Sequence, residues 1–229
     1  AHTPAADPGW LGAWRVADDA AATAIGRVLG DDALSEPLVA RVLAARLPPD
    51  ATLFVASSMP VRDIESFMAV RDDAPRVLSN RGANGIDGTI SSAFGAAAVA
   101  SGPVVLLIGD VALAHDVGGL LAARRLGLAL TIVVLDNDGG GIFEFLPIAA
   151  ARDAFEEHVA TPHGLDFAHA AALYGCAYAD VGDRAALDDA LEGALASDAT
   201  TIIRVASDRA ANVALHRELQ AAVAAALAV

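Results

Sequence analysis

The sequence predicts an α/β protein in which helices cover both faces of a mainly parallel sheet of about six strands, in three layers. Short apolar runs rich in Val, Ile and Leu alternate with helical patterns along the 229 residues, as in chains that return to a parallel sheet after each helix. The strongest runs are apolar at every position, which is typical of strands buried on both faces. The length is ample for one large domain, or for a domain with an appendage.

The apolar runs give the strands in order. Five are expected, at residues 52–56, 77–79, 104–108, 130–135 and 201–205, and the third and fourth are the strongest. Helical patterns lie between them. Ser35 has the position of an N-cap for a helix that Pro48 ends, and Asp183 and Asp208 have the same position before two later helices. These two helices are expected at 185–196 and 210–228, and three more at 90–100, 117–126 and 167–174.

The start of the chain differs from the rest. Residues 1–33 carry Pro and Gly followed by an Ala-rich segment, helical through about 15–29, and we interpret them as a linker from an upstream domain. Residues 34–229 form the α/β domain. The first residues show neither an initiator Met nor the basic-then-apolar pattern of a signal peptide.

Composition excludes several classes of function. The net charge is −14 and there is no basic stripe, so nucleic acid is not expected as a partner. The fifteen cationic residues are all Arg, which excludes a Schiff-base or P-loop lysine. Cys176 is the single cysteine, so internal disulfides and a Cys-based zinc site are excluded and a cytoplasmic setting is expected. No apolar stretch reaches the length of a membrane span.

Polar residues follow the two strongest strands at the point where each ends. Asp110 follows VVLLIG, and Asn137 follows LTIVVLD and precedes Gly139–Gly141. Because ligands of parallel sheets bind beyond the carboxyl ends of the strands, the two side chains should meet. One carboxylate and one amide oxygen suit Mg²⁺ that carries a diphosphate. Asp110 as a helix cap, and the glycines as a flexible turn, remain alternatives.

Two further strand ends carry candidates for anion binding. Ser57 and Ser58 can cap a helix that begins near Pro60, or can point at a phosphate together with its N–H groups, and Arg62 would face the same place. Arg81 lies in the glycine-rich stretch SNRGANGIDG and is an anion-binding candidate, unless it pairs with Asp87 or another carboxylate of the loop.

The remaining candidates are weaker. The apolar segment 142–147 is either a lid over the site or a core-facing turn. His115, His158, His163 and His169 lack the spacing of a metal set, so each is expected to be a surface or capping residue.

The motifs resemble a known family. A Gly-Asp pair followed after 26 residues by Asn is the thiamine-diphosphate signature, here Gly109-Asp110 and Asn137. The stretches SNRGANGIDG, GDVALAHDVGGL and NDGGGIFEFLP are similar to those of the 2-succinyl-5-enolpyruvyl-6-hydroxy-3-cyclohexene-1-carboxylate (SEPHCHC) synthases, the MenD enzymes of menaquinone biosynthesis. The resemblance runs from about residue 45 to the C-terminus and implies a three-layer thiamine-diphosphate-binding fold.

The resemblance implies roles for two sets of residues. Mg²⁺, or Mn²⁺ in its place, would be bound by the side chains of Asp110 and Asn137 and the carbonyl of Gly139. The cofactor would be contacted by Ser58, Met59, Ile86 (an apolar wedge beneath the bent cofactor), Gly109, Ala112 and the metal ligands. Some family members carry a hydroxyl residue where Ala112 stands, so only a backbone contact to phosphate is implied there. Carboxylates of 2-oxoglutarate or isochorismate would be bound by Arg62 and Arg81, and the substrate pocket would be lined by Ile142, Phe143 and Leu146.

The implied reaction needs a second domain. In the family, 2-oxoglutarate is decarboxylated and the succinyl carbanion equivalent is added to isochorismate, at a site between domains of two subunits of a homodimer or homotetramer. The activating glutamate belongs to the pyrimidine-binding domain, which residues 1–33 are too short to form. We therefore expect this chain to be the diphosphate-binding domain and to be inactive alone. Two alternatives stay open: the diphosphate-binding subunit of a two-chain 2-oxoacid decarboxylase, and a non-catalytic phospholigand-binding or assembly module.

Overall fold

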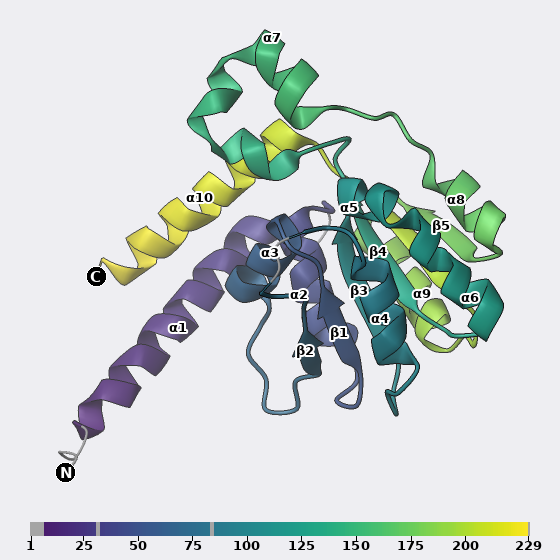
Figure 1. Cartoon of the computed structure of the whole chain (residues 1–229). Coiled ribbons are helices and arrows are strands. Elements are labelled where there is room, and N and C mark those ends of the chain that lie inside the picture. Colours follow the sequence, from purple (N-terminus) through teal and green to yellow (C-terminus); the bar gives the residue numbers. More distant parts are fainter. Residues whose placement is uncertain (1–6, 31–32, 83–84, 229) are drawn as a thin grey trace.

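The computed structural model describes residues 7–30, 33–82 and 85–228. Its centre is a six-stranded sheet in the order β2-β1-β3-β4-β6-β5, in which every neighbouring pair is parallel (Figure 1). The strands are β1 (Thr52–Val55), β2 (Arg76–Leu78), β3 (Val104–Gly109), β4 (Thr131–Asp136), β5 (Ala177–Val181) and β6 (Thr201–Ala206). The predicted fold class is confirmed.

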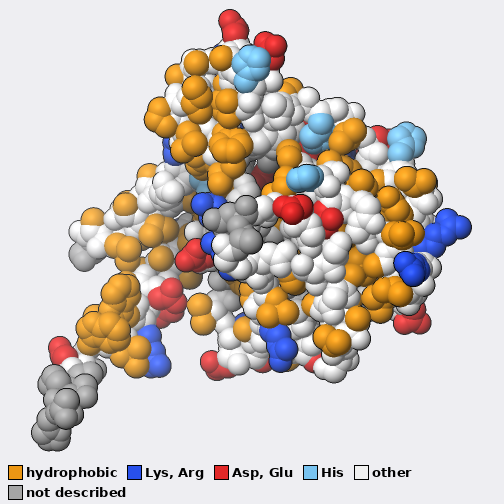
Figure 2. Space-filling model, viewed as in Figure 1, with side chains coloured by type: hydrophobic (Ala, Val, Ile, Leu, Met, Phe, Trp, Pro, Cys, Tyr) orange, Lys and Arg blue, Asp and Glu red, His pale blue; other side chains and the backbone are white. Residues whose placement is uncertain are grey.

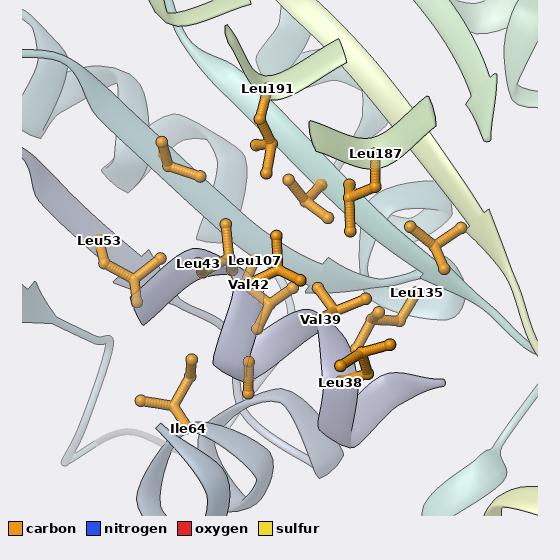
Figure 3. Close-up of a cluster of buried hydrophobic side chains, with 14 of the residues drawn as sticks. Leu38, Val39, Val42, Leu43, Leu53, Ile64, Leu107, Leu135, Leu187 and Leu191 are labelled. Atoms are coloured by element: carbon orange, nitrogen blue, oxygen red, sulfur yellow. The ribbon is translucent and has the colours of Figure 1, made fainter. Parts of the chain in front are cut away.

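Helices cover both faces of this sheet. One face packs against α2 (Glu36–Arg46), α3 (Met59–Phe67) and α9 (Arg184–Leu195), and the other against α4 (Thr89–Ala97), α5 (Asp110–His115) and α8 (Phe167–Tyr174). Because side chains alternate along a strand, Val105 and Leu107 of β3 enter the first core and Leu106 and Ile108 the second. Figure 3 shows the first core, with Leu38, Val39 and Val42 of α2 lying over Leu107 and Leu135 of the sheet.

Short helical segments lie before and after β4 in the sequence. They are η1 (Val117–Leu120), α6 (Leu121–Leu126), η2 (Gly141–Phe145), η3 (Pro147–Ala150), α7 (Arg152–Phe155) and η4 (Glu156–Ala160). The segment from η2 to η4 follows β4 and stands above the carboxyl ends of the strands (Figure 1). Predicted helix 117–126 is thus a 3₁₀ turn followed by a short α-helix.

The predicted caps are confirmed. Ser35 Oγ accepts from Leu38 N at 3.3 Å, Asp183 Oδ1 from Ala186 N at 2.8 Å, and Asp208 Oδ1 from Ala211 N at 2.7 Å. They begin α2, α9 and α10 (Arg209–Leu227). The sequence analysis missed β5, the edge strand beside β6, because its side chains are mostly exposed or half-buried and give no continuous apolar run.

The first helix, α1 (Pro8–Leu29), begins earlier than predicted, where Asp7 Oδ1 accepts from Gly9 N at 2.9 Å. It lies along α10, and both project from the sheet (Figure 1). Its outer part exposes Trp10 and Trp14. Figure 2 shows hydrophobic side chains gathered on this projecting helix, at the lower left of the view. The boundary at residues 33–34 stays a prediction. None of the described helices has the length and hydrophobicity that crossing a membrane requires.

The central strands should carry much of the stability. We expect Leu107→Ala, at a fully buried position of β3, to lower the free energy of unfolding by about 2–5 kcal/mol, because it removes buried methyl groups and leaves a cavity. Urea unfolding followed by circular dichroism measures this. The exposed Val99→Ala is the control and should change the free energy by less than about 0.5 kcal/mol.

One ion pair between α2 and α9 should make stability depend on pH. Arg46 donates to Asp188 at 2.8 Å, and this hydrogen bond lowers the pKa of the Asp188 carboxyl. A carboxyl whose pKa is lower in the folded state stabilises the fold when the pH is above its unfolded-state pKa of about 3.9. This stabilisation is lost as the pH falls through the folded-state pKa. We expect Asp188→Asn to cost under about 1 kcal/mol at neutral pH, since Arg46 is half exposed.

The test for this pair compares urea midpoints of the wild type and Asp188→Asn from neutral pH downward. The difference should shrink as the solution becomes acidic enough to protonate Asp188. The neighbouring exposed Asp189→Asn serves as control. A difference that stays constant to the acid limit of folding would contradict the assignment.

Candidate functional site: the ends of β3 and β4

The register of β3 and β4 brings the two predicted strand ends together. Gly109 lies opposite Leu135, so Asp110 and Asn137 both emerge at the carboxyl edge of the sheet. Asp110 is the first residue of α5, and Asn137 directly follows β4. The prediction that these two strand ends lie side by side is confirmed.

The Asp110 carboxylate is buried and already holds part of the glycine loop. Its Oδ1 accepts from Val111 N at 2.7 Å and its Oδ2 from Gly139 N at 2.9 Å. Burial raises the pKa of Asp110 by more than these hydrogen bonds lower it. The cap position of α5 is occupied by Gly109, and the cap has no side-chain hydrogen bond, so the alternative that Asp110 is the N-cap is wrong.

The Asn137 side chain is oriented by a buried acid. Its Nδ2 donates to Glu36 Oε1 at 2.9 Å, and Ser207 Oγ donates to the same oxygen at 2.7 Å. Burial raises the pKa of Glu36. Asn137 Oδ1 is buried and has no hydrogen-bond partner among the described residues. An unpaired buried oxygen beside a carboxylate is the donor set that a hard divalent cation takes, so the residues fit Mg²⁺.

Two glycines of the loop leave no room for a side chain. Gly139 has φ +135°, and a Cβ there would lie 2.2 Å from the carbonyl oxygen of Ala160. A Cβ on Gly141 would lie 2.5 Å from Asn137 Nδ2. The glycines therefore let the loop press against both Asn137 and the segment around Ala160. This close packing gives the glycines a steric role in the loop.

All predicted cofactor and metal residues line one cavity of about 340 Å³. They are Ser58, Met59, Ile86, Gly109, Asp110, Ala112, Asn137 and Gly139. Ser58 is the residue before α3 and has φ 77°, and its side chain makes no capping hydrogen bond. The alternative that its hydroxyl caps the helix is therefore wrong.

A second cavity of about 510 Å³ adjoins the first and shares Met59, Ile142 and Phe143 with it. The predicted substrate residues Arg62 and Leu146 also line it, together with Phe145. Four of the five predicted substrate residues thus surround one space. The fifth, Arg81, is exposed and lines neither cavity.

Within the described residues the two arginines differ in their contacts. Arg62 Nη1 donates to the carbonyl of Ser58 at 2.6 Å, at the start of its own helix. No ion pair joins Arg81 to Asp87 among the residues that the structure describes, so the alternative of that salt bridge has no support. The second cavity also has a buried acid behind it, since Asp63 Oδ1 lies 3.2 Å from the lining residue His216. Burial raises the pKa of Asp63 although His216 opposes it.

The sequence analysis missed two groups next to Asp110. The side chain of His163 is only 16% exposed and its Nε2 lies 3.2 Å from Asp110 Oδ2, so the expectation of a surface or capping residue is wrong for it. Asp136, the last residue of β4, is buried, and its Oδ2 accepts from Arg204 Nε at 2.6 Å. No local sequence pattern predicts the contact of His163 with Asp110, because the two residues are 53 positions apart.

Comparison with known proteins assigns the family. The family described as thiamine pyrophosphate enzyme, C-terminal TPP binding domain, matches residues 62–205. The chain belongs to this family. The cavity at the ends of β3 and β4 lies mostly within the matched residues.

Curated relatives are longer than this chain. The SEPHCHC synthase of Myxococcus xanthus (strain DK1622) is 48% identical over 226 residues, which are 95% of this chain and 38% of that protein. The synthase of the same name from Bacillus velezensis is 43% identical over 224 residues, 97% of this chain and 39% of that protein. The predicted resemblance is confirmed, and the chain spans about two fifths of the length of these relatives.

A solved structure supports the fold. The thiamine diphosphate-dependent 4-hydroxybenzoylformate decarboxylase of Rhodococcus jostii RHA1 superposes with a TM-score of 0.63 and 23% identity. The match covers 77% of this chain and 33% of that chain. At this identity the likeness concerns the fold alone.

The glycine loop gives a test of the site's packing. We expect Gly139→Ala to lower the free energy of unfolding by more than about 1 kcal/mol, because the new Cβ meets the Ala160 carbonyl and the residue has a positive φ. Gly193→Ala is the matched control. Gly193 lies in α9 with open space around it, so Ala should stabilise the helix by about 0.5–1 kcal/mol. Equal effects in urea unfolding would contradict this description of the loop.

Proposed function

We propose that this chain is the diphosphate- and Mg²⁺-binding part of a thiamine-diphosphate-dependent SEPHCHC synthase. The whole enzyme would decarboxylate 2-oxoglutarate and transfer the succinyl unit to isochorismate in menaquinone biosynthesis. The observation that carries the proposal is the unpaired, buried Asn137 Oδ1 beside Asp110, at a cavity lined by the residues of the family motif. The two relatives that are 48% and 43% identical to this chain over the matched residues bear this enzyme name.

The first cavity would hold the cofactor. Asp110, Asn137 and the Gly139 carbonyl would bind Mg²⁺, with Mn²⁺ as a substitute, and the backbone of Gly109 and Ala112 would meet the phosphates. Ser58, Met59 and Ile86 would contact the remainder of the cofactor, with Ile86 as its apolar support. When bound, thiamine diphosphate supplies the electron sink for decarboxylation. The chain's own residues then contribute position and electrostatic stabilisation.

The second cavity would take the substrates, because it opens beside the first. Ile142, Phe143 and Leu146 would form its apolar wall and exclude water. Arg62 would bind a carboxylate of 2-oxoglutarate or isochorismate by turning from the Ser58 carbonyl. Arg81, in the loop that also carries Ile86 of the first cavity, would bind a substrate carboxylate from outside the second cavity. Phe143 and Leu146 are partly exposed, as expected for a wall that another domain completes.

The active assembly would include a pyrimidine-binding domain from a second subunit, in a cytoplasmic homodimer or homotetramer. This domain would supply the activating glutamate, so we propose no catalytic acid in this chain and expect the chain alone to be inactive. The greater length of the curated relatives supports this division of roles.

The proposal is tested in the complete polypeptide that carries this chain, assayed with thiamine diphosphate, Mg²⁺, 2-oxoglutarate and isochorismate. We expect product formation that requires both substrates. Asp110→Ala should lower kcat/KM by more than the roughly 10- to 100-fold typical of residues that only support a metal ligand. The exposed Asp72→Asn is the control and should leave the rate unchanged.

Four outcomes would count against the proposal. Full activity of Asp110→Ala would remove the metal site from the mechanism. Turnover of 2-oxoglutarate by the 229-residue chain alone would show that no second domain is needed. Turnover of another 2-oxoacid without isochorismate would favour the two-chain decarboxylase, and absence of any cofactor binding would favour a non-catalytic module.

A further inference from the structure

The His163 ring is held between Asp110 and a turn of the backbone. Nε2 lies 3.2 Å from Asp110 Oδ2, and Nδ1 accepts from the N–H of Leu165 at 3.0 Å. The ring meets the buried Phe167 ring edge-on, with 5.9 Å between the centroids. These three contacts fix both the position and the rotation of the imidazole.

The contacts also determine which ring nitrogen carries the proton. A neutral imidazole has one N–H donor and one acceptor nitrogen. Because Nδ1 accepts the Leu165 N–H, its lone pair is used and the proton lies on Nε2. Nε2 therefore donates to Asp110 Oδ2, which also accepts from Gly139 N.

These hydrogen bonds determine which carboxylate oxygen of Asp110 is available to bind a cation. A carboxylate oxygen accepts about two hydrogen bonds. Oδ2 has two donors, Gly139 N and His163 Nε2, whereas Oδ1 has one, Val111 N. Oδ1 thus keeps a free lone pair for a cation.

The same tautomer excludes a competing metal site. Asp110, Asp136 and His163 each offer one ligand atom, and these atoms lie within 4.8 Å of one another. However, Nε2 is protonated in this tautomer, and Asp136 is engaged by Arg204 and by the N–H of Asp138. A cation therefore finds no free donor on His163, so the three residues cannot act together as a metal set.

The loop at residues 137–141, which carries the predicted metal ligands Asn137 and Gly139, also holds His163 in position. Asp138, which stands between the predicted ligands Asn137 and Gly139, accepts from the N–H groups of His163 and Gly164, both at 2.8 Å. Gly140 N donates to Ala160 O at 2.8 Å, and Arg209 joins the carbonyl of Asp138 to Glu156. The turn at 161–165 is thus bound to the loop that it supports.

We propose that His163 is a positioning residue for the metal: its Nε2–H holds the Asp110 carboxylate so that Oδ1 is free to bind the cation that carries the diphosphate. This inference rests on the proposed function, since it concerns the same metal. The turn at 161–165 contains none of the family motif, yet by this inference it contributes to the affinity for the cofactor.

The test replaces the donor and keeps the length of the side chain. His163→Met lacks a donor, whereas His163→Gln restores an N–H near the position of Nε2. In the complete polypeptide with thiamine diphosphate, Mn²⁺ binding is titrated by electron paramagnetic resonance. We expect His163→Met to weaken Mn²⁺ binding by about 10- to 100-fold, and His163→Gln to recover most of the loss. His169→Met, at an exposed histidine, should bind like the wild type.

The comparison of Met with Gln separates positioning from packing. Thermal unfolding confirms that both variants are folded, and a purely structural role would weaken both alike. Equal Mn²⁺ affinity of wild type and His163→Met, or equal losses in Met and Gln, would overturn the inference and leave the proposed function intact. If the wild type binds Mn²⁺ and thiamine diphosphate no better than Asp110→Ala, the proposed function fails and the inference fails with it.

Discussion

The parallel pairing of β3 with β4 is the constraint on which the site depends. Its register sets Gly109 against Leu135, so the next residues of both strands leave the sheet at the same edge. Asp110 is then close enough to accept from Gly139 N, two residues beyond Asn137. A slip of one residue would turn Leu106 and Leu107 to the wrong cores and would separate Asp110 from Asn137. The hydrophobic cores on the two faces therefore fix the geometry of the site as well as the fold.

This constraint has an electrostatic cost, because it gathers acids where water is excluded. Glu36, Asp110 and Asp136 are each nearly inaccessible and lie around the same strand ends. Asp136 has Arg204 as its partner, and burial raises the pKa of Glu36 and of Asp110, which favours their neutral forms. A divalent cation at Asp110 and Asn137 would reverse this for Asp110, since a bound cation stabilises the ionised carboxylate. A bound cation would thus offset part of the cost of burying these acids.

The features that could be predicted from the sequence are those that depend on neighbouring residues. The buried strands, the caps at Ser35, Asp183 and Asp208, and the meeting of Asp110 with Asn137 all follow from apolar runs, hydrogen-bonding side chains and parallel topology. The edge strand β5 was missed because only one of its five residues is buried, so it has no continuous apolar run. His163 and Glu36 were missed because they reach the site through tertiary packing, 53 and 101 positions from the residues that they contact. Long-range pairs of this kind have no periodic or spacing signature in a single sequence.

The lining of the first cavity bears on how a diphosphate could bind there. None of the described residues that line it is Arg, Lys or His, and two, Glu36 and Asp110, are acids. Backbone N–H groups can meet phosphate oxygens but cannot balance several negative charges in a site with a low effective dielectric constant. A diphosphate could therefore remain beside Asp110 only together with a cation, and the cation would gain ligands from the diphosphate. Metal and cofactor affinity should consequently be coupled through reciprocal linkage, each strengthening the other by the same factor. The positioning of Asp110 by His163 would then act on both.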